Sequence, residues 1–168
     1  MTIDLGELRP EKLREFHNTS SFCCGRRDID EFIQKQAKDF QKLRLGITHL
    51  WFLDDRLVAF VTLSMSDVGR KRMRSEDQLP IGVENYPAVL IGQLGVQEEY
   101  QGKGIGSQIC QWCYGKAISL SEQIGCTFIV LNAEEDSIDW YLKRGFKLLP
   151  DQEKRRQKWL TRKIVFLS

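Results

Sequence analysis

The stretch VQEEYQGKGIGSQICQW, residues 96–112, places three glycines within five positions, at Gly102, Gly104 and Gly106. Glycine has no Cβ and tolerates positive φ, so this cluster lets backbone amides approach a ligand closely. A helical pattern follows the glycines, and the first amides of a helix have no partner within the helix. Since the N-terminal end of a helix dipole is positive, the stretch predicts an anion-binding loop.

The segments around this loop indicate an α/β fold with a mixed sheet. AVLIGQLGV, residues 88–96, is an apolar strand before the loop, and Gly125 and Gly145 are expected to end two later helices. After the loop, the expected elements are a helix over about 103–122, a strand over 126–133, a short helix over 137–144, a short run over 146–149 and a last strand over 159–167.

The N-terminal half predicts a helix followed by a hairpin. RRDIDEFIQKQAKDFQKL, residues 26–43, begins with Asp28 and Glu31 placed as an N-cap and its reciprocal partner. Its apolar residues have helical spacing and are Ile29, Phe32, Ile33, Ala37, Phe40 and Leu43. Residues 47–65 give two β-rich runs around a tight Asp-Asp turn, and residues 66–87 are interpreted as an irregular excursion.

Length and composition limit the class of protein. A chain of 168 residues and 19.6 kDa is most simply one domain over residues 1–168. It has no run of about 20 apolar residues that would span a bilayer, and its start, MTIDLGELRP, lacks the features of a signal peptide. We therefore expect a cytoplasmic protein without a membrane partner, with its five cysteines reduced.

The basic residues are clustered, although the net charge is only +2. The clusters are GRKRMR, with Arg70, Lys71, Arg72 and Arg74, and KRRQKWLTRK, with Lys154, Arg155, Arg156, Lys158, Arg162 and Lys163. The two clusters form one basic face if the fold brings them together, and otherwise they are two solvated loops.

Three kinds of phosphate-binding loop can be compared with QGKGIG, residues 101–106. A P-loop requires a lysine after its last glycine, whereas Gly106 is followed directly by Ser107. A dinucleotide fingerprint requires Gly-x-Gly-x-x-Gly, whereas these glycines are spaced by two throughout. The Gln/Arg-x-x-Gly-x-Gly/Ala loop of acyl-coenzyme A binders matches at Gln101, Gly104 and Gly106, which makes pyrophosphate the expected anion.

The strand before the loop has a second feature that coenzyme A requires. Gly92 and Gly95 allow the strand to bulge away from its neighbour. The amides near Leu94 and Val96 would then be free to pair with pantetheine as if it were an added strand.

Residues 88–149 resemble the GNAT family of acetyl-coenzyme A-dependent N-acetyltransferases, with VLIGQLGV, EEYQGKGIG, FIVLNA and WYLKRGF in this order. WYLKRGF matches the family's aromatic-Tyr-x-x-x-Gly-Phe at Trp140, Tyr141, Gly145 and Phe146. The resemblance implies a single-domain GNAT fold with a mixed, mostly antiparallel central sheet flanked by helices on both faces. It also implies acetyl-coenzyme A as cosubstrate, bound by Leu94, Gly95, Val96, Gln101, Gly102, Lys103, Gly104, Ile105, Gly106, Ser107 and Asn132.

Acetyl transfer from a thioester to an amine requires a polarised carbonyl and a proton for the leaving thiolate. The amide around Leu94 is the expected oxyanion donor, and the resemblance assigns the proton to Tyr141. The alternative for Tyr141 is a core tyrosine whose hydroxyl bonds a backbone carbonyl. No general base is evident, because the candidates are more simply surface or capping residues: Glu98, Glu99, Glu134, Glu135, Asp136 and His49.

The N-terminal stretch FCCGRRDIDEFI, residues 22–33, is similar to the Phe-x-Cys-Gly helix opening of GNAT toxins from bacterial toxin-antitoxin pairs. The match falls on Phe22, Cys24, Gly25, Ile29, Phe32 and Ile33. It implies aminoacyl-tRNA as acceptor, the basic clusters as its phosphate track, a small DNA-binding antitoxin as partner, and a homodimer. Such an α-amine has a pKa well below the value of about 10.4 for lysine, so it suits an enzyme without a base.

The sequence also departs from these toxins in two ways, because Gln93 stands where they often carry a basic residue and the net charge is only +2. A protein N-terminus or a small amine therefore remains open as the acceptor. Two other classes are a GNAT fold that binds coenzyme A without turnover and a nucleic-acid binder without catalysis. No metal site is expected, since Cys110 and Cys113 would have to leave the helix core face and meet the distant pair Cys23 and Cys24.

Overall fold

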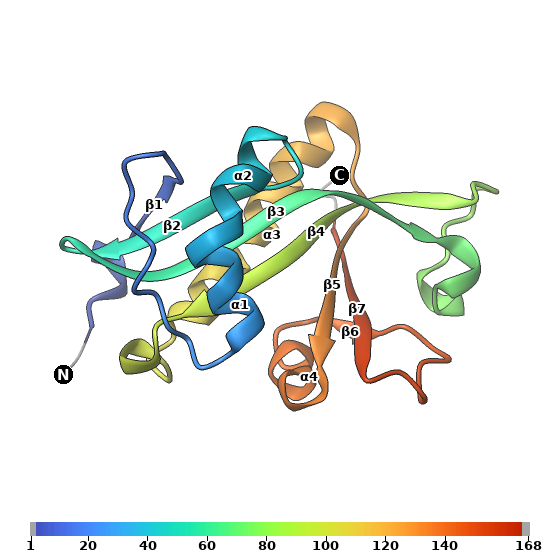
Figure 1. The fold of residues 1–168 in the computed structure, drawn as a ribbon. Coiled ribbons are helices and arrows are strands. Elements are labelled where there is room, and N and C mark those ends of the chain that lie inside the picture. The colour runs from blue at the N-terminus through green and yellow to red at the C-terminus, as the bar shows by residue number, and fades with distance from the viewer. Residues whose placement is uncertain (1–2, 166–168) are drawn as a thin grey trace. The chain divides into compact units, whose positions relative to one another are not determined.

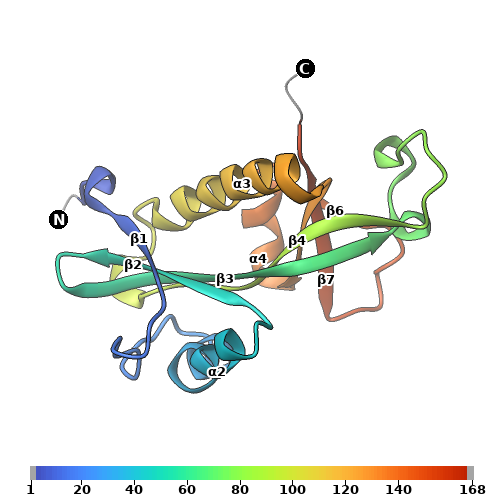
Figure 2. The ribbon, with the colours of Figure 1, turned by 90° about the horizontal axis from the view of Figure 1, so that it is seen from above.

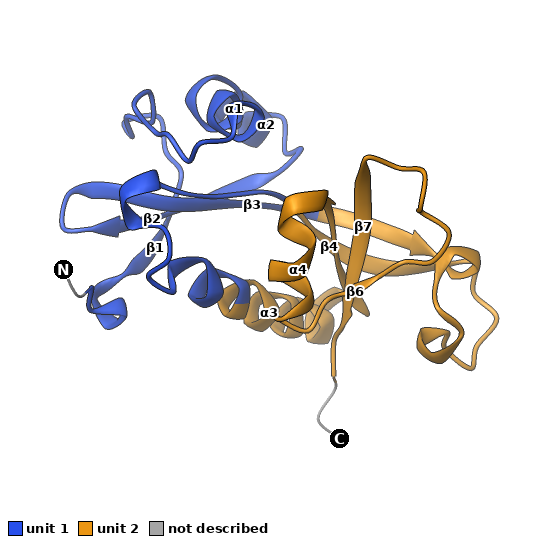
Figure 3. Cartoon of the chain, turned by 90° about the horizontal axis from the view of Figure 1, so that it is seen from below, with its two compact units in different colours: residues 1–64, 92–110 blue, residues 65–91, 111–168 orange. Residues whose placement is uncertain are grey.

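The computed structural model describes residues 3–165 (Figure 1, Figure 2). Within these residues, seven strands form one mixed sheet in the order β1-β2-β3-β4-β5-β7-β6. The chain divides into two compact units, Met1–Ser64 with Gly92–Cys110 and Met65–Ile91 with Gln111–Ser168 (Figure 3). Three elements contribute to both units: β3 (Arg56–Gly69), β4 (Asn85–Val96) and α3 (Ile105–Ile124).

The first unit contains an antiparallel set of strands. β1 (Arg9–Lys12) pairs with β2 (Ile47–Leu53), which forms the expected hairpin with β3. In the hairpin turn, Asp54 has a φ of 53°. The sequence pattern does not predict β1, because its four residues, RPEK, are all exposed and include a proline. Short 3₁₀ turns precede β1 (η1, Leu5–Glu7) and follow β4 (η5, Glu98–Tyr100).

The expected N-terminal helix is present but is interrupted by a π turn. It consists of α1 (Arg27–Glu31), the π-helical η2 (Phe32–Gln36) and α2 (Ala37–Lys42). Of its predicted apolar face, Phe40 and Leu43 are 36% and 71% exposed. A π turn holds more residues than an α turn, so it rotates the residues that follow it about the helix axis. The apolar face predicted from regular spacing is therefore correct only through Ala37, which is buried.

Helices and strands surround a core of large side chains in the first unit. α1 and α2 lie on one face of the strands, and the first turns of α3 lie on the other (Figure 2, Figure 3). This unit therefore has helices on both faces of its sheet, as expected. The buried residues between the strands and α1, η2 and α2 include Leu13, Phe22, Phe32, Ile33, Ala37, Leu50 and Phe60.

Gly95 has no room for a side chain within this core. A Cβ at Gly95 would lie 2.9 Å from Phe60 Cε1 and 3.1 Å from both Ile29 Cγ2 and Phe22 Cε1. We expect Gly95→Ala to lower the free energy of unfolding by about 1–3 kcal/mol, because buried rings must shift to accept the methyl group. Denaturant unfolding measures this, with Gly115→Ala as control, since a Cβ at Gly115 meets no atom within 4 Å. An unchanged midpoint for Gly95→Ala would contradict the packing.

The second unit holds the parallel pair of the sheet. β4 pairs in parallel with β5 (Phe128–Glu134) from Ala88 to Ile91, and β5 pairs antiparallel with β7 (Gln157–Lys163). β7 pairs with the short β6 (Lys147–Leu148), and α4 (Glu135–Leu142) contacts β5, β6 and β7. The pair of β4 and β5 is parallel and four other pairs are antiparallel, so the α/β class and the mixed, mostly antiparallel sheet are confirmed. Its buried core includes Val68, Met73, Tyr86, Ala88, Phe128, Val130 and Leu149.

The segment expected to be irregular is shorter than residues 66–87. β3 continues to Gly69 and β4 already begins at Asn85. Two 3₁₀ turns, η3 (Arg70–Arg72) and η4 (Ser75–Asp77), lie between them. The end of the last predicted strand, 166–167, lies outside the described residues. Among the residues that are described, no helix is long and apolar enough to cross a membrane.

Two helices end at the glycines where their ends were predicted, whereas the predicted N-cap of the first helix is wrong. α3 ends before Gly125 and α4 before Gly145, which have φ of 73° and 88°. At α1 the N-cap is Arg26, which makes no side-chain capping bond. Asp28 lies inside the first turn, where its charge favours the positive end of the helix dipole instead.

Candidate functional site

The glycine loop presents unpaired backbone amides in the first unit. Gly102 and Gly104 have φ of 75° and 88°, a conformation that L-residues rarely adopt. Among the described residues, the amides of Gly102, Lys103 and Gly104 have no hydrogen-bond partner, and all three residues are exposed. α3 begins directly after them at the buried Ile105, so the positive end of its helix dipole lies beside these amides. Free amides beside a helix N-terminus are the groups that bind anions in proteins, and anion binding by this loop stays a prediction.

Two glutamine side chains fasten this loop to the N-terminal segment. The Gln97 Oε1 atom accepts from the Cys23 amide at 2.9 Å, and the Glu98 amide donates to the Cys23 carbonyl at 3.0 Å. The Gln101 Nε2 atom donates to the carbonyls of Cys24 at 2.7 Å and Val96 at 2.8 Å. We call these four hydrogen bonds the clasp. Three of these bonds join segments that are more than 70 residues apart in the sequence, and the bond between Gln101 and Val96 is local.

The clasp explains the Phe-x-Cys-Gly stretch physically. Phe22 fills the core, and the backbone of Cys23 and Cys24 supplies the clasp partners. Gly25 has a φ of 92°, and a Cβ there would lie 2.9 Å from Glu98 Oε1. Because its side-chain nitrogen serves the clasp, Gln101 braces the loop, and its contribution to cofactor binding stays a prediction. Sequence reasoning missed Gln97, for which no motif gave a signal.

The strand before the loop carries the other predicted donors. Leu94 and Val96 are half-buried, and Gly95 is held against the core rings described above. The Val96 carbonyl accepts one bond of the clasp, so the end of β4 is fixed to the loop it precedes. Pairing of these amides with pantetheine, and the oxyanion role of the amide near Leu94, stay predictions.

Tyr141 lies on α4 in the second unit, within an aromatic cluster. Its ring packs edge-on against Trp140 at 4.9 Å and Phe146 at 5.7 Å between centroids. The Arg144 guanidinium covers Trp140 at 3.6 Å, and the Tyr141 carbonyl accepts the amides of Arg144 and Phe146 at 2.9 and 3.3 Å. The matched Tyr-x-x-x-Gly-Phe thus builds a tight helix end that fixes the half-buried ring.

Asn132 is exposed on β5, and its side chain serves the sheet. The Asn132 Nδ2 atom donates to Gln157 Oε1 at 3.0 Å, and Gln157 Nε2 donates to Glu134 Oε1 at 2.7 Å. The predicted role of Asn132 in cofactor binding stays a prediction, since its amide nitrogen already has this partner.

The two basic clusters adjoin within the second unit. The Arg72 guanidinium lies 5.9 Å from the centre of the Trp159 ring, and Arg74 reaches Thr161 in the second cluster. The exposed basic residues are Lys71, Arg72, Lys154, Arg155, Arg156 and Lys163. Arg162 instead covers the Tyr114 ring at 3.9 Å. The fold therefore brings the two clusters together, but not all of their charges face solvent.

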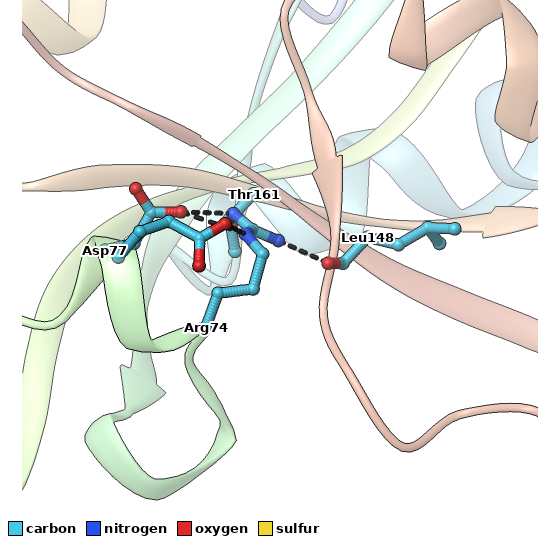
Figure 4. A network of polar contacts seen from close by, with 5 residues as sticks. Arg74, Asp77, Leu148 and Thr161 are labelled. Atoms are coloured by element: carbon cyan, nitrogen blue, oxygen red, sulfur yellow. Dashed lines mark hydrogen bonds and ion pairs between the residues drawn. The ribbon is translucent and has the colours of Figure 1, made fainter.

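Arg74 has a structural role rather than the predicted surface role (Figure 4). Its guanidinium donates to Asp77 Oδ2 at 2.6 and 3.0 Å, to Thr161 Oγ1 at 3.0 Å and to the Leu148 carbonyl. The side chains of Arg74 and Asp77 are only 15% and 11% exposed. This buried network ties η4 to β6 and β7, which a run of basic letters cannot indicate.

We expect removal of Arg74 to lower the stability of the fold and not to weaken ligand binding directly. In Arg74→Ala, the buried Asp77 carboxylate loses the guanidinium that pairs with it, and we expect a loss of about 3–5 kcal/mol in the free energy of unfolding. Chemical denaturation measures this. Lys71→Ala, which removes an exposed charge of the same cluster, is the control and should be close to neutral. Equal stabilities for the two variants would show that the network contributes nothing.

The candidates for a general base lie on exposed or half-buried positions. Glu98 and Glu99 are exposed on η5, and Glu99 lies 3.7 Å from Arg56. His49 is half-buried in β2. Glu134 bonds Gln157, and Glu135 and Asp136 are exposed at the start of α4. No base can be assigned from these positions.

The five cysteines form no disulfide and differ in burial. Cys110, Cys113 and Cys126 are buried, whereas Cys23 is exposed and Cys24 is half-buried. Within the part of the chain that is described, no group of three or more His, Cys, Asp or Glu residues could hold a metal ion. Burial, the largest cause, raises the pKa of the Cys24 thiol from 9.0 to about 12.

The raised pKa predicts selective alkylation. The thiolate is the reactive form, so Cys24 should stay largely unlabelled by iodoacetamide at pH 8–9, and its labelling should increase as the pH approaches the pKa of about 12. The adjacent, exposed Cys23 provides an internal comparison in the same peptide. Mass spectrometry of the labelled peptide distinguishes the two positions, and equal labelling at pH 8 would contradict the burial of Cys24.

The curated relative "tRNA-acetylating toxin" of Mycobacterium tuberculosis is 24% identical over 152 residues, which cover 86% of this chain and 87% of the relative. The solved structures that are similar in fold include two of the toxin AtaT. AtaT complexed with acetyl-methionyl-tRNAfMet has a TM-score of 0.79 at 20% identity and covers 90% of this chain and 93% of its own. A tyrosine-to-phenylalanine variant of the AtaT toxin, bound to the C-terminus of the antitoxin AtaR and acetyl-CoA, has a TM-score of 0.77 at 18% identity, covering 94% and 93%.

The model of one protein family matches residues 10–146, from β1 to the end of the aromatic Tyr-x-x-x-Gly-Phe motif. This range includes the clasp, the glycine loop and Tyr141. Acetyl-coenzyme A, the donor expected from the loop, is the donor that this family uses. The chain belongs to the acetyltransferase (GNAT) family of acetyl-coenzyme A-dependent enzymes.

Proposed function

We propose that this chain transfers the acetyl group of acetyl-coenzyme A to the α-amine of aminoacyl-tRNA, as a toxin of a toxin-antitoxin pair. The observation that carries the donor half is the row of unpaired amides at Gly102, Lys103 and Gly104, held by the clasp at the start of α3. The acceptor half is supported by the similarity of nearly the whole chain to a tRNA-acetylating toxin. In this proposal, residues 1–168 act as one acetyltransferase domain.

In the proposed reaction, the acceptor nitrogen attacks the thioester carbonyl and the carbon–sulfur bond breaks. The loop amides and the positive end of α3 bind the pyrophosphate of coenzyme A. The amide near Leu94 stabilises the oxyanion, and Tyr141 gives its hydroxyl proton to the departing thiolate. The amine loses its own proton to solvent. An aminoacyl ester makes this loss easy, because its ammonium is more acidic than that of lysine.

The exposed basic residues of the second unit are the proposed contacts for tRNA phosphates. They are Lys71, Arg72, Lys154, Arg155, Arg156 and Lys163, and Arg74 is excluded because it is internally bonded. Binding through phosphates depends steeply on salt. A tRNA substrate would place the enzyme in the cytoplasm, and an antitoxin that binds the enzyme, as AtaR binds AtaT, would keep it inactive. Formation of a homodimer stays a prediction, which light scattering of the purified protein checks.

The test is acetyl transfer with radiolabelled acetyl-coenzyme A and total charged tRNA. We expect label on the tRNA fraction that is released by mild base, which cleaves the aminoacyl ester. Deacylated tRNA is the matched control and should take up no label. Label on peptides or small amines but not on tRNA would favour the alternative acceptors. Binding of acetyl-coenzyme A without turnover on any amine would favour a non-catalytic module.

A further inference from the structure

A basic pocket lies in the first unit, at the place where β1 and the turn after it meet α2 and the start of β2. It has a volume of about 380 Å³, and its charged lining residues are Lys12, Arg14, Lys38, Lys42, Arg44 and Glu15. Five basic side chains and one carboxylate leave a formal excess of four positive charges. The entire chain has a net charge of only +2, so positive charge is unusually concentrated at this pocket.

Hydrogen bonds fix the walls of this pocket. The Gln41 side chain donates from Nε2 to the Leu13 carbonyl at 2.6 Å and accepts from the Thr48 amide at 3.0 Å. The Lys38 Nζ atom donates to the carbonyls of Glu15 at 2.9 Å and His17 at 2.6 Å. An ammonium has three donors, so Lys38 retains one after these two bonds. These bonds fix the wall of the pocket that Lys38 and Gln41 form.

Most of the positive charge in the pocket is uncompensated. The carboxylate of Glu15 is already bound by Lys42 at 3.1 Å. Among residues 3–165, the side chains of Lys12, Arg14 and Arg44 have no ion-pair partner. Three cations that share one concave surface without a partner repel one another, and a bound anion would remove that repulsion.

Arg44 is placed at the pocket at a backbone cost. It follows the C-cap of α2 with a φ of 59°, the position at which helices usually carry glycine. Its amide bonds the Gln41 carbonyl, and the Leu45 amide bonds the Phe40 carbonyl, which closes the helix end. Glycine would adopt this turn without strain. We therefore attribute the arginine at this position to a role of its side chain in the pocket.

We propose that this pocket is a second anion site that holds a phosphate group, separate from the glycine loop. A phosphate offers several acceptor oxygens and full negative charge to clustered guanidinium and ammonium groups, which bind it by charge-assisted hydrogen bonds. The same chemistry comes from a free phosphorylated molecule or from an RNA backbone. The inference does not depend on the proposed function, because it concerns binding and not acetyl transfer.

The test is calorimetric titration of the full chain saturated with coenzyme A, so that the glycine loop is already occupied. Inorganic tripolyphosphate is the free probe, and deacylated tRNA is the RNA probe. The variant Arg14→Gln/Arg44→Gln removes two unpaired charges, and Lys12→Gln/Arg14→Gln is a second variant that leaves the turn after α2 intact. Lys143→Gln/Lys147→Gln is the control, since it removes the same charge from exposed positions outside the pocket. Thermal unfolding verifies that all variants are folded.

We expect both pocket variants to weaken tripolyphosphate binding by about tenfold or more, with the control close to the parent protein. If the parent protein binds tRNA but not tripolyphosphate, and the pocket variants weaken tRNA more than the control does, the phosphate comes from RNA. If neither probe distinguishes the pocket variants from the control, the proposal is wrong. Failure of tRNA acetylation with intact tripolyphosphate binding would overturn the proposed function alone.

Discussion

Gly104→Val is expected to reduce affinity for acetyl-coenzyme A by about a hundredfold or more while the protein stays folded. A β-branched residue resists the φ of 88° found at this position, at a cost of about 1–3 kcal/mol, so the loop must rearrange. Rearrangement turns the Gly104 amide away from its neighbours and places an isopropyl group beside the row of free amides. A Cβ at this position comes no closer than 3.4 Å to another residue, at Leu5 Cδ1. The substitution therefore does not disturb the packing of the core.

Isothermal titration with coenzyme A measures this effect, and circular dichroism reports the fold. Gly115→Ala is the matched control, because Gly115 lies in α3 without a positive φ or a close neighbour. It should bind coenzyme A normally. Normal binding by Gly104→Val as well would show that the loop does not hold the pyrophosphate.

Tyr141→Phe is expected to lower kcat by about a hundredfold or more, which is the usual range for loss of a general acid. Only the hydroxyl is removed, so the edge-on packing against Trp140 and Phe146 remains. Affinity for coenzyme A should therefore change little. The measurement is steady-state acetylation of the proposed acceptor, aminoacyl-tRNA, together with calorimetric titration of coenzyme A.

Tyr114→Phe is the control for Tyr141→Phe, because it removes a tyrosine hydroxyl that has a structural role and no proposed catalytic role. The Tyr114 hydroxyl accepts the Val165 amide at 3.0 Å, so its loss is expected to reduce stability by about 1 kcal/mol and to leave kcat unchanged. If Tyr141→Phe behaves like Tyr114→Phe, the proton for the thiolate comes from another group and Tyr141 is a packing residue.

Glycine was the most informative residue for prediction from the sequence. Gly102, Gly104, Gly125 and Gly145 all have positive φ, at the loop and the helix ends where the sequence indicates them. These positions are set by local backbone conformation, which neighbouring residues already specify. The order and type of the main helices and strands could be predicted for the same reason, because they too are specified largely by neighbouring residues.

Features that depend on distant partners were not predictable. Arg74 occurs in a run of basic residues, yet its partners include Leu148 and Thr161, more than 70 residues away. β1 exists because β2 pairs with it, and RPEK alone carries no strand pattern. The pocket cations are scattered from Lys12 to Arg44, and they meet through the pairing of β1 with β2 and the hydrogen bonds of Lys38 and Gln41 to the segment after β1.

Because of the clasp, we expect hydrogen exchange in residues 22–25 to report the binding of acetyl-coenzyme A at the glycine loop. The Cys23 amide and the Glu98 amide exchange with solvent only when the bonds between these segments open. If acetyl-coenzyme A immobilises the glycine loop, we expect it also to hold the segment of Cys23 and Cys24 closed and to increase the protection of these amides from hydrogen exchange. By reciprocity, anything that loosens residues 22–25 weakens the grip on the donor, including changes at Asp30 and Gln34, whose side chains bond Cys24 and Phe22.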